Sequence, residues 1–238
     1  MSDVILTIIS LGANELDIIL PPDAGAAFRA YYDFLEEHGQ NVNLTAIAGA
    51  KEVACLHFLD SLALLKTADF TNATVIDIGS GAGFPGVPLI IAKPSMSLTL
   101  LDATGKRITF LNDLCVKLGI TAKCVNSRAE EAAHLTEFRE QYDIAVSRAV
   151  AKLNVLCELC LPFVKKGGKF IAMKSIDSAD EVNEAQSSIA TLGAKIERFY
   201  DYTLHDTNVT HRAIIINKTD NTPDKYPRRF AKIQKSPL

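Results

Sequence analysis

The sequence predicts an α/β fold in which a mostly parallel sheet is covered by helices on both faces. Two observations support it: from residue 74 onward, apolar β-branched runs alternate with helical patterns, and the last two runs follow each other with no room for a helix. Alternating units build parallel sheets because each helix returns the chain to the same edge. The last two runs therefore predict a C-terminal β-hairpin on a seven-stranded sheet.

The seven runs are bounded by turn residues, as expected for buried strands. The predicted strands are 74–78, 97–101, 122–125, 143–147, 169–174, 195–202 and 212–217. The helical patterns between them are 87–92, 106–118, 129–135, 153–161 and 178–192. We expect residues 73–218 to form one domain built on this sheet.

The two ends of the chain lack this alternation. Residues 1–72 predict a helical extension, because apolar residues recur at helical spacing over 21–39 and again over 51–65. The polar segment 40–47 between them predicts a turn. Residues 219–238 contain three prolines and little periodicity, which predicts an irregular basic arm on or near the same domain.

Charge is unevenly distributed along the 238 residues, although the net charge is only −3. Residues 1–72 carry 3 basic and 10 acidic side chains, residues 73–174 carry 13 and 9, and residues 218–238 carry 6 and 2. The basic central part and tail suit a polyanionic partner. An ordinary solvated surface of uneven charge explains the same distribution.

Composition favours a cytoplasmic protein. The five cysteines are odd in number and scattered, which indicates reduced thiols. No apolar run approaches the roughly 18 residues of a membrane helix, and the N-terminus lacks the basic flank of a signal peptide. Cys157 and Cys160 lie in an apolar helical pattern without a second pair, so we expect buried thiols and no metal site.

The segment 74–86, TVIDIGSGAGFPG, joins the first predicted strand to a glycine-rich turn. Glycine permits positive φ and lets a ligand approach the main chain, so such turns hold nucleotide-like ligands. Gly81-x-Gly83-x-x-Gly86 fits the dinucleotide fingerprint. Gly79-x-Gly81-x-Gly83 fits the loop of S-adenosylmethionine-dependent methyltransferases. Asp102, after the second strand, would accept hydrogen bonds from ribose hydroxyls in either case.

Three features favour the methyltransferase over a nicotinamide-dependent oxidoreductase. Asp77 ends the first strand, where a carboxylate would face the amino group of a methionine moiety but repel a pyrophosphate. Pro85 removes an N–H where a phosphate would need one. The hairpin ending differs from the two-halves layout of dinucleotide domains.

Several segments, in order along nearly the whole chain, resemble the RsmG family, also called GidB. They are 41–47 (NVNLTAI), 57–62 (HFLDSL), 77–86 (DIGSGAGFPG), 106–107 (KR) with 110–111 (FL), 128–130 (RAE), 147–149 (SRA) and 226–229 (YPRR). The resemblance implies a Rossmann-like S-adenosylmethionine-dependent methyltransferase. It further implies a bacterial enzyme that methylates N7 of a guanosine in 16S ribosomal RNA, with the small ribosomal subunit or an assembly intermediate as partner.

The expected site follows from the resemblance together with the glycine turn. The resemblance implies S-adenosylmethionine contacts at Gly79, Phe84, Ala129, Glu130 and Arg148, and the turn and second strand add Gly81 and Asp102. Glu130 would receive the adenine amino group. Arg148 would position either the methionine side of the cofactor or the acceptor base.

The residues agree with N7 as the acceptor. An exocyclic amine is usually methylated beside an Asn- or Asp-Pro-Pro-aromatic motif, and the fourth strand instead ends in Ser147-Arg148. A pyrimidine carbon would need a cysteine nucleophile, and none of the five follows a proline. Guanine N7 has a free lone pair and no proton to remove, so positioning supplies the catalysis, up to roughly 7–11 kcal/mol.

Expected RNA contacts lie in the central domain, the tail and the helical extension: Asn43, His57, Lys106, Arg107, Arg228 and Arg229. Tyr226 and Phe230 would stack on bases. We expect a monomer. The alternatives are a small-molecule methyltransferase and a non-catalytic RNA-binding protein with the same fold.

Overall fold

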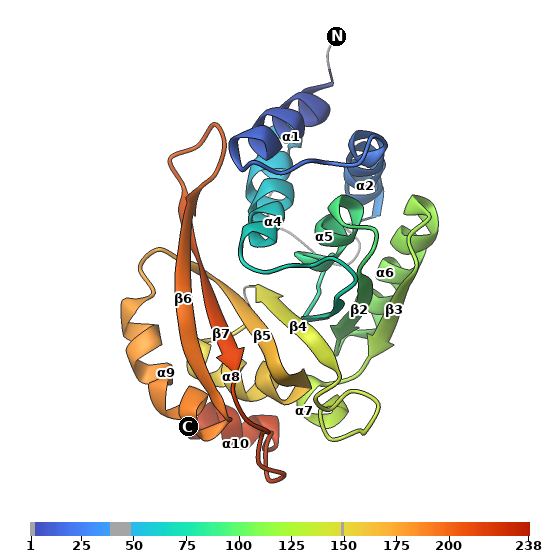
Figure 1. The fold of residues 1–238 in the computed structure, drawn as a ribbon. Coiled ribbons are helices and arrows are strands. Elements are labelled where there is room, and N and C mark those ends of the chain that lie inside the picture. Colours follow the sequence, from blue (N-terminus) through green and yellow to red (C-terminus); the bar gives the residue numbers. More distant parts are fainter. Residues whose placement is uncertain (1–2, 39–48, 149) are drawn as a thin grey trace.

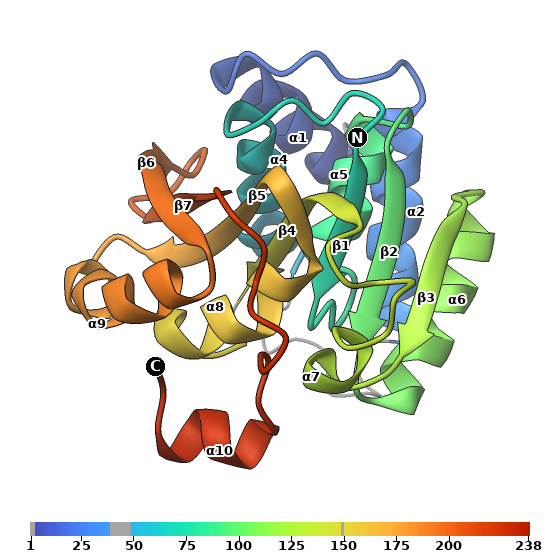
Figure 2. The same cartoon turned by 60° about the horizontal axis from the view of Figure 1, so that its bottom comes forward.

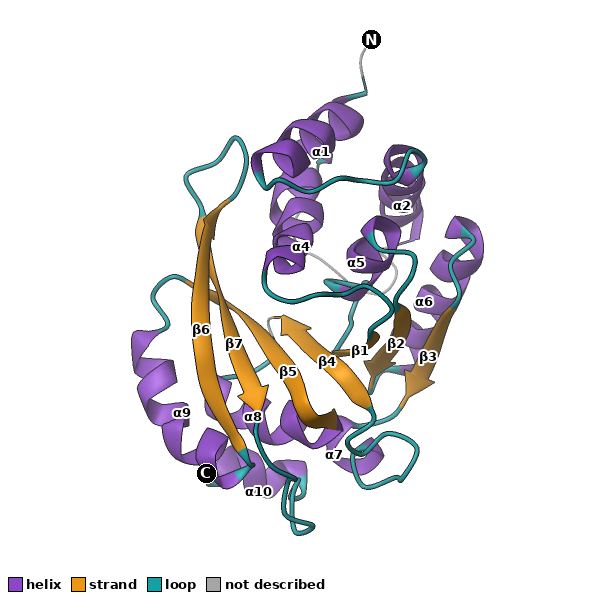
Figure 3. Ribbon diagram, in the orientation of Figure 1, coloured by secondary structure: helices purple, strands orange, loops and turns teal. Residues whose placement is uncertain are grey.

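The computed structural model describes residues 3–38, 49–148 and 150–238. The elements, in chain order (Figures 1 and 3), are α1 (Val4–Glu15), α2 (Ala24–His38), α3 (Ala50–Val53), η2 (Ala54–Leu59), α4 (Asp60–Leu62), η3 (Ala63–Lys66), β1 (Thr74–Ile78), α5 (Gly86–Ala92), β2 (Ser97–Asp102), α6 (Gly105–Leu118), β3 (Ala122–Asn126), α7 (Ala129–Ala132), β4 (Tyr142–Arg148), α8 (Leu153–Cys160), η4 (Leu161–Phe163), β5 (Val164–Ser175), α9 (Ala179–Thr191), β6 (Ala194–Thr203), β7 (Thr210–Lys218) and α10 (Phe230–Lys235).

All seven predicted strands are present in one sheet, with the order β3-β2-β1-β4-β5-β7-β6. The first five strands pair in parallel, whereas β7 is antiparallel to both β5 and β6. The predicted hairpin is therefore confirmed. Because β1 lies between β2 and β4, the chain leaves β1 toward one side of the sheet and leaves β4 toward the other, so the glycine turn lies beside the point where the strand order reverses. Ligands of α/β proteins bind at such a reversal.

Side chains alternate along the strands and build a core on each face of the sheet. Val75 and Val146 belong to the core beneath α1, α2, η2, α5 and α6. Ile76 and Ala145 belong to the core beneath α7, α8 and α9. The sheet is thus covered on both faces, as the continuous apolar strands predict.

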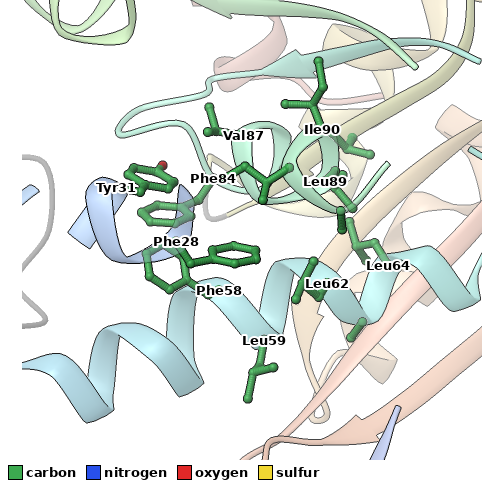
Figure 4. Close-up of a cluster of buried hydrophobic side chains, with 14 of the residues drawn as sticks. Phe28, Tyr31, Phe58, Leu59, Leu62, Leu64, Phe84, Val87, Leu89 and Ile90 are labelled. Carbon is green, nitrogen blue, oxygen red and sulfur yellow. The ribbon is translucent and has the colours of Figure 1, made fainter. Parts of the chain in front are cut away.

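The N-terminal helices are packed on the first of these cores. The rings of Tyr31, Phe58 and Phe84 gather there, with centroids 5.1 Å apart for Tyr31 and Phe58 and 5.3 Å for Tyr31 and Phe84 (Figure 4). The second predicted helix is present but contains a π-helical turn, η2, in its middle. The predicted turn at 40–47, which includes Asn43, lies outside the described residues.

The C-terminal arm was expected to be irregular, and this is wrong for its last part. Phe230–Lys235 form the short helix α10, which Figures 1 and 2 show near α8. Ile233 is fully buried in the core beneath α8 and α9. Burial of this single residue stabilises a helix too short to show a periodic pattern. None of the helices in the described part of the chain has both the length and the apolarity of a membrane span.

Candidate active site

A cavity of about 420 Å³ lies at the carboxyl edge of the sheet, where β1, β2, β3 and β4 end. It collects every cofactor-binding residue that the sequence predicts: Gly79, Gly81, Phe84, Asp102, Ala129, Glu130 and Arg148. Following the sheet order, Ala129 and Asp102 lie on one side of the glycine turn and Arg148 on the other. The cavity therefore has two chemically different ends.

The glycine turn forms the floor of this cavity. Gly79 and Gly81 have φ of +75° and +57°, values that other residues rarely adopt. The N–H of Gly79 donates to the carbonyl of Leu101, at 2.8 Å, which ties the turn to β2. A Cβ on Gly79 would lie 2.6 Å from a methyl carbon of Val150. Gly79 is thus needed for both conformation and space, whereas at Gly81, where a Cβ would lie 3.9 Å from the carbonyl oxygen of Gly79, the requirement is one of conformation.

Asp102, at the end of β2, is buried and hydrogen-bonded on both oxygens. Its Oδ1 accepts from the N–H of Thr104 at 2.8 Å, and its Oδ2 accepts from the N–H of Gly81 at 3.1 Å. Arg107 Nη1 lies 3.3 Å from the same Oδ2. Arg107 thus lines the cavity beside Asp102, and its expected contact with RNA stays a prediction.

Asp77, also expected beside the ligand, does not line the cavity. Its side chain is fully buried behind the glycine turn, where Oδ2 accepts from the N–H of Gly86 at 2.8 Å. Oδ1 has no hydrogen-bond partner among the described residues. Burial raises the pKa of this carboxyl to about 7, although the Gly86 bond and the charge of Arg148 oppose the rise.

Arg148, at the end of β4, is held from three sides. Its Nη1 donates to Asp60 Oδ2 at 3.1 Å and to the carbonyl of Leu56 at 3.2 Å. Its Cζ lies 4.9 Å from the centre of the Phe84 ring, which is a cation–π arrangement. These contacts point the guanidinium along one wall of the cavity.

Asp60, on α4, is buried beneath Arg148. Only 2% of Asp60 is exposed. Its Oδ1 accepts from the hydroxyl of Tyr202 and from Nδ1 of His211, both at 2.8 Å. Burial alone would raise the pKa of Asp60, but the His211 hydrogen bond and the Arg148 charge lower it. Asp60 thus joins the N-terminal helices to β4 and to the β6–β7 hairpin.

His57 is likewise buried, and it lines the cavity. Its ring stacks on Phe84 with centroids 4.6 Å apart, and its Nδ1 lies 3.1 Å from Arg148 Nη2. Burial and the neighbouring Arg148 charge lower the pKa of His57 to about 4. The imidazole is therefore neutral at physiological pH and forms part of the packed wall.

Glu130 and Ala129 lie at the other end of the cavity, on α7. Arg128 Nε donates to Glu130 Oε1 at 2.6 Å. The Arg128 guanidinium also lies 4.9 Å from the ring centre of Phe230, a residue of the arm. Phe230 also lines this cavity, and its expected stacking on an RNA base stays a prediction.

The remaining predicted RNA contacts divide into two groups. Lys106 and Arg229 are exposed, as such contacts require. Arg228 is hydrogen-bonded to the buried carboxylate of Glu158, with Nη2 2.6 Å from Oε2, so its guanidinium is directed into the protein. Tyr226 is also buried, which contradicts the expected stacking on a base.

The predicted buried thiols are confirmed. Cys157 and Cys160 are free and buried, and burial raises the pKa of Cys157 to about 12. Over residues 3–38, 49–148 and 150–238, no group of three His, Cys, Asp or Glu side chains is arranged to hold a metal ion.

Comparison with known proteins identifies relatives along nearly the whole chain. A protein named ribosomal RNA small subunit methyltransferase G from Desulforamulus reducens is 42% identical over 240 residues, covering both chains completely. Another of that name from Lachnoclostridium phytofermentans is 46% identical over 229 residues, 95% of each chain.

Solved structures support the fold. A methyltransferase from Pyrococcus furiosus aligns with a TM-score of 0.57 over 81% of this chain and 98% of its own, at 12% identity. TrmN from Thermus thermophilus aligns with a TM-score of 0.52 over 68% of this chain and 48% of its own, at 17% identity. The architecture is thus that of Rossmann-like methyltransferases. Since the family model GidB, rRNA small subunit methyltransferase G, also matches residues 25–210, the chain belongs to this family.

Proposed function

We propose that this protein transfers a methyl group from S-adenosylmethionine to N7 of a guanosine in 16S ribosomal RNA. The observation that carries the proposal is the cavity at the reversal point of the sheet, built by a glycine turn and an acidic strand end. The names of the relatives supply the class of RNA. The choice of N7 rests on the chemistry of the cavity and on the family resemblance.

The residues present fit S-adenosylmethionine. A volume of about 420 Å³ lies within the usual range of small-ligand sites, roughly 300–1,000 Å³. The backbone of Gly79 and Gly81 allows close approach of the ligand. Asp102 would accept hydrogen bonds from the ribose hydroxyls, with Arg107 moving aside, and Glu130 would accept one from the adenine amino group. When bound, the cofactor supplies an electrophilic methyl group on a positively charged sulfur.

The cavity provides orientation and lacks an evident general base among its described residues. Glu130 and Asp102 are both hydrogen-bonded, His57 is stacked and neutral, and Arg148 is a permanent cation. Guanine N7 needs no deprotonation before it attacks a methyl group. We infer that Arg148 orients the reacting groups and that catalysis comes from their alignment.

The RNA would approach the open edge of the same cavity. Lys106, at the start of α6, and Arg229, just before α10, are exposed on the elements that border it. Exposed cations of this kind bind phosphates and make affinity depend on salt. The helical extension and the C-terminal arm would complete the binding surface.

The test is methyl transfer to defined RNA. Purified protein is incubated with radiolabelled S-adenosylmethionine and either 30S subunits or free 16S RNA from cells that lack the gene. We expect one labelled guanosine, which borohydride reduction followed by aniline cleavage locates as a 7-methylguanosine. Label at another atom would overturn the N7 assignment. No transfer to either RNA, from protein that binds S-adenosylhomocysteine, would favour a small-molecule enzyme or a non-catalytic protein.

A further inference from the structure

After β7 the C-terminal arm runs between α8 and α7 before it enters α10 (Figure 2). The guanidinium of Arg139 holds its first part, because Nη2 donates to the carbonyl of Thr222 at 2.8 Å and Nη1 to that of Tyr226 at 2.9 Å. His134 Nε2 lies 2.8 Å from the carbonyl oxygen of Pro227. The path of the arm is therefore set by several contacts with the main domain.

The strongest of these attachments involves Glu158 on α8, whose side chain is fully buried. Its Oε1 accepts from both the backbone N–H and Nε of Arg228 at 2.8 Å, and its Oε2 accepts from Nη2 at 2.6 Å. A buried carboxylate is costly without such a partner. The two-pronged geometry fixes the orientation as well as the position of Arg228.

Arg228 lies two residues before Phe230, which begins α10 and lines the cavity together with Ala129, Glu130 and Leu159. One face of the Phe230 ring is covered by the guanidinium of Arg128. Burial of Ile233 in the core holds the other side of this short segment. The ring is thus fixed at the end of the cavity that lies away from Arg148.

We propose that Arg228 is a positioning residue that holds Phe230 as a wall for the adenine ring of the cofactor. This inference rests on the proposed function, in which Glu130 and Ala129 bind adenine. A flat, apolar ring stacks well on a purine, and the aromatic side chain presents such a surface without moving. The arm then completes the cofactor site, while the exposed Arg229 next to it remains available to RNA.

The test is calorimetry with S-adenosylhomocysteine on the full-length protein. Phe230→Ala should weaken binding about tenfold, in line with the loss of one stacking contact. Phe230→Tyr keeps the ring and should bind within about twofold of the wild type. Lys235→Ala, an exposed change on the same helix, is the matched control and should have no effect.

A double-mutant cycle tests the role of Arg228. Arg228→Lys keeps the charge but loses the two-pronged contact, and should weaken binding about fivefold; Arg228→Lys combined with Phe230→Ala should be no weaker than Phe230→Ala alone. Equal affinity of Phe230→Ala and wild type would overturn the inference and leave the proposed function standing. Failure of the folded wild type to bind would instead overturn the proposed function. Wild-type affinity of folded Arg228→Lys would overturn the positioning role of Arg228. If Arg228→Lys does not fold, the Phe230 variants still decide whether Phe230 is a wall of the adenine site.

Discussion

Two buried aspartates beside the cavity, Asp60 and Asp77, show opposite electrostatic behaviour. Only 2% of Asp60 and none of Asp77 is exposed. Asp60 is bonded to Arg148, Tyr202 and His211, and its pKa is lowered. Among the described residues, the carboxyl of Asp77 accepts one hydrogen bond, from the N–H of Gly86, and its pKa is raised to about 7. Burial is common to both, so the partners decide which carboxyl stays charged.

The difference assigns separate roles to the two residues. Asp60 is a charged anchor that holds Arg148 against the cavity and joins three distant parts of the chain. Asp77 fills space behind the glycine turn: a Cβ on Gly86 would lie 2.8 Å from its Oδ2, so turn and carboxyl are in close contact. Removing the charge of Asp60 should therefore destabilise the folded protein, whereas removing the titratable group of Asp77 should stabilise it at high pH.

The largest effect is expected for Asp60→Ala. The change leaves Arg148 and Tyr202 without their buried partner, which should lower the free energy of unfolding by about 3–5 kcal/mol. Methyl transfer should also fall about a hundredfold, because displacement of a positioning group by about 1 Å has this effect. Urea denaturation and initial rates with S-adenosylmethionine and RNA measure the two quantities.

Asp201→Ala is the matched control for this change. Like Asp60, Asp201 is hydrogen-bonded to an arginine: Nε and Nη2 of Arg212 donate to its Oδ1 and Oδ2, both at 2.7 Å. Unlike Asp60, 41% of its side chain is exposed. Exposed pairs contribute roughly 0–1 kcal/mol. If Asp60→Ala cost as little as Asp201→Ala, the anchor role would be refuted.

Asp77→Asn should change the free energy of unfolding by a comparable or smaller amount than Asp60→Ala, and at high pH it should stabilise the protein. A carboxyl with a raised pKa binds its proton more tightly in the folded protein, so the folded state loses stability as pH rises from about 4 to about 7. Over this range the free energy of unfolding of the wild type should fall by at most about 4 kcal/mol relative to that of the variant. Above pH 7 the difference between the two should stay constant. Urea denaturation at pH 4.5, 6 and 8 measures this difference. A difference that does not change with pH would show that Asp77 is charged in the folded state.

Sequence patterns predicted the sheet because its signals are local. Each strand is an apolar run bounded by turn residues, and the 13 residues 74–86, which hold the first strand and the glycine turn, predict the position of the cavity. The residues expected at that cavity from the ends of neighbouring strands, such as Gly79, Asp102 and Arg148, do line it. Parallel strands bring their carboxyl ends to one edge, so strand order alone places these residues together.

The unpredicted parts of the site depend on pairs distant in sequence. Asp60 is 142 residues from Tyr202 and 151 from His211, and Arg228 is 70 from Glu158. Such pairs leave no periodic or local pattern in a single sequence. Basic residues such as Arg228 were therefore expected on the surface, where most cations lie, although this one is the partner of a buried carboxylate.

The smallest effect is expected at His211, the residue of β7 that is hydrogen-bonded to Asp60. The hydrogen bond to Asp60 raises the pKa of His211 above 6.5, against burial and the Arg148 charge. The protonated form is thus favoured by folding, so its stabilisation is complete below pH 6.5 and is lost as pH rises through the raised pKa. His211→Gln should therefore be about 1 kcal/mol less stable than wild type at pH 5.5 and nearly equal at pH 9. Tyr202→Phe is the control: the pKa of Tyr202 lies well above 10, so its deficit should be the same at both pH values. An equal deficit for His211→Gln at both would show that the imidazole is an uncharged partner of Asp60.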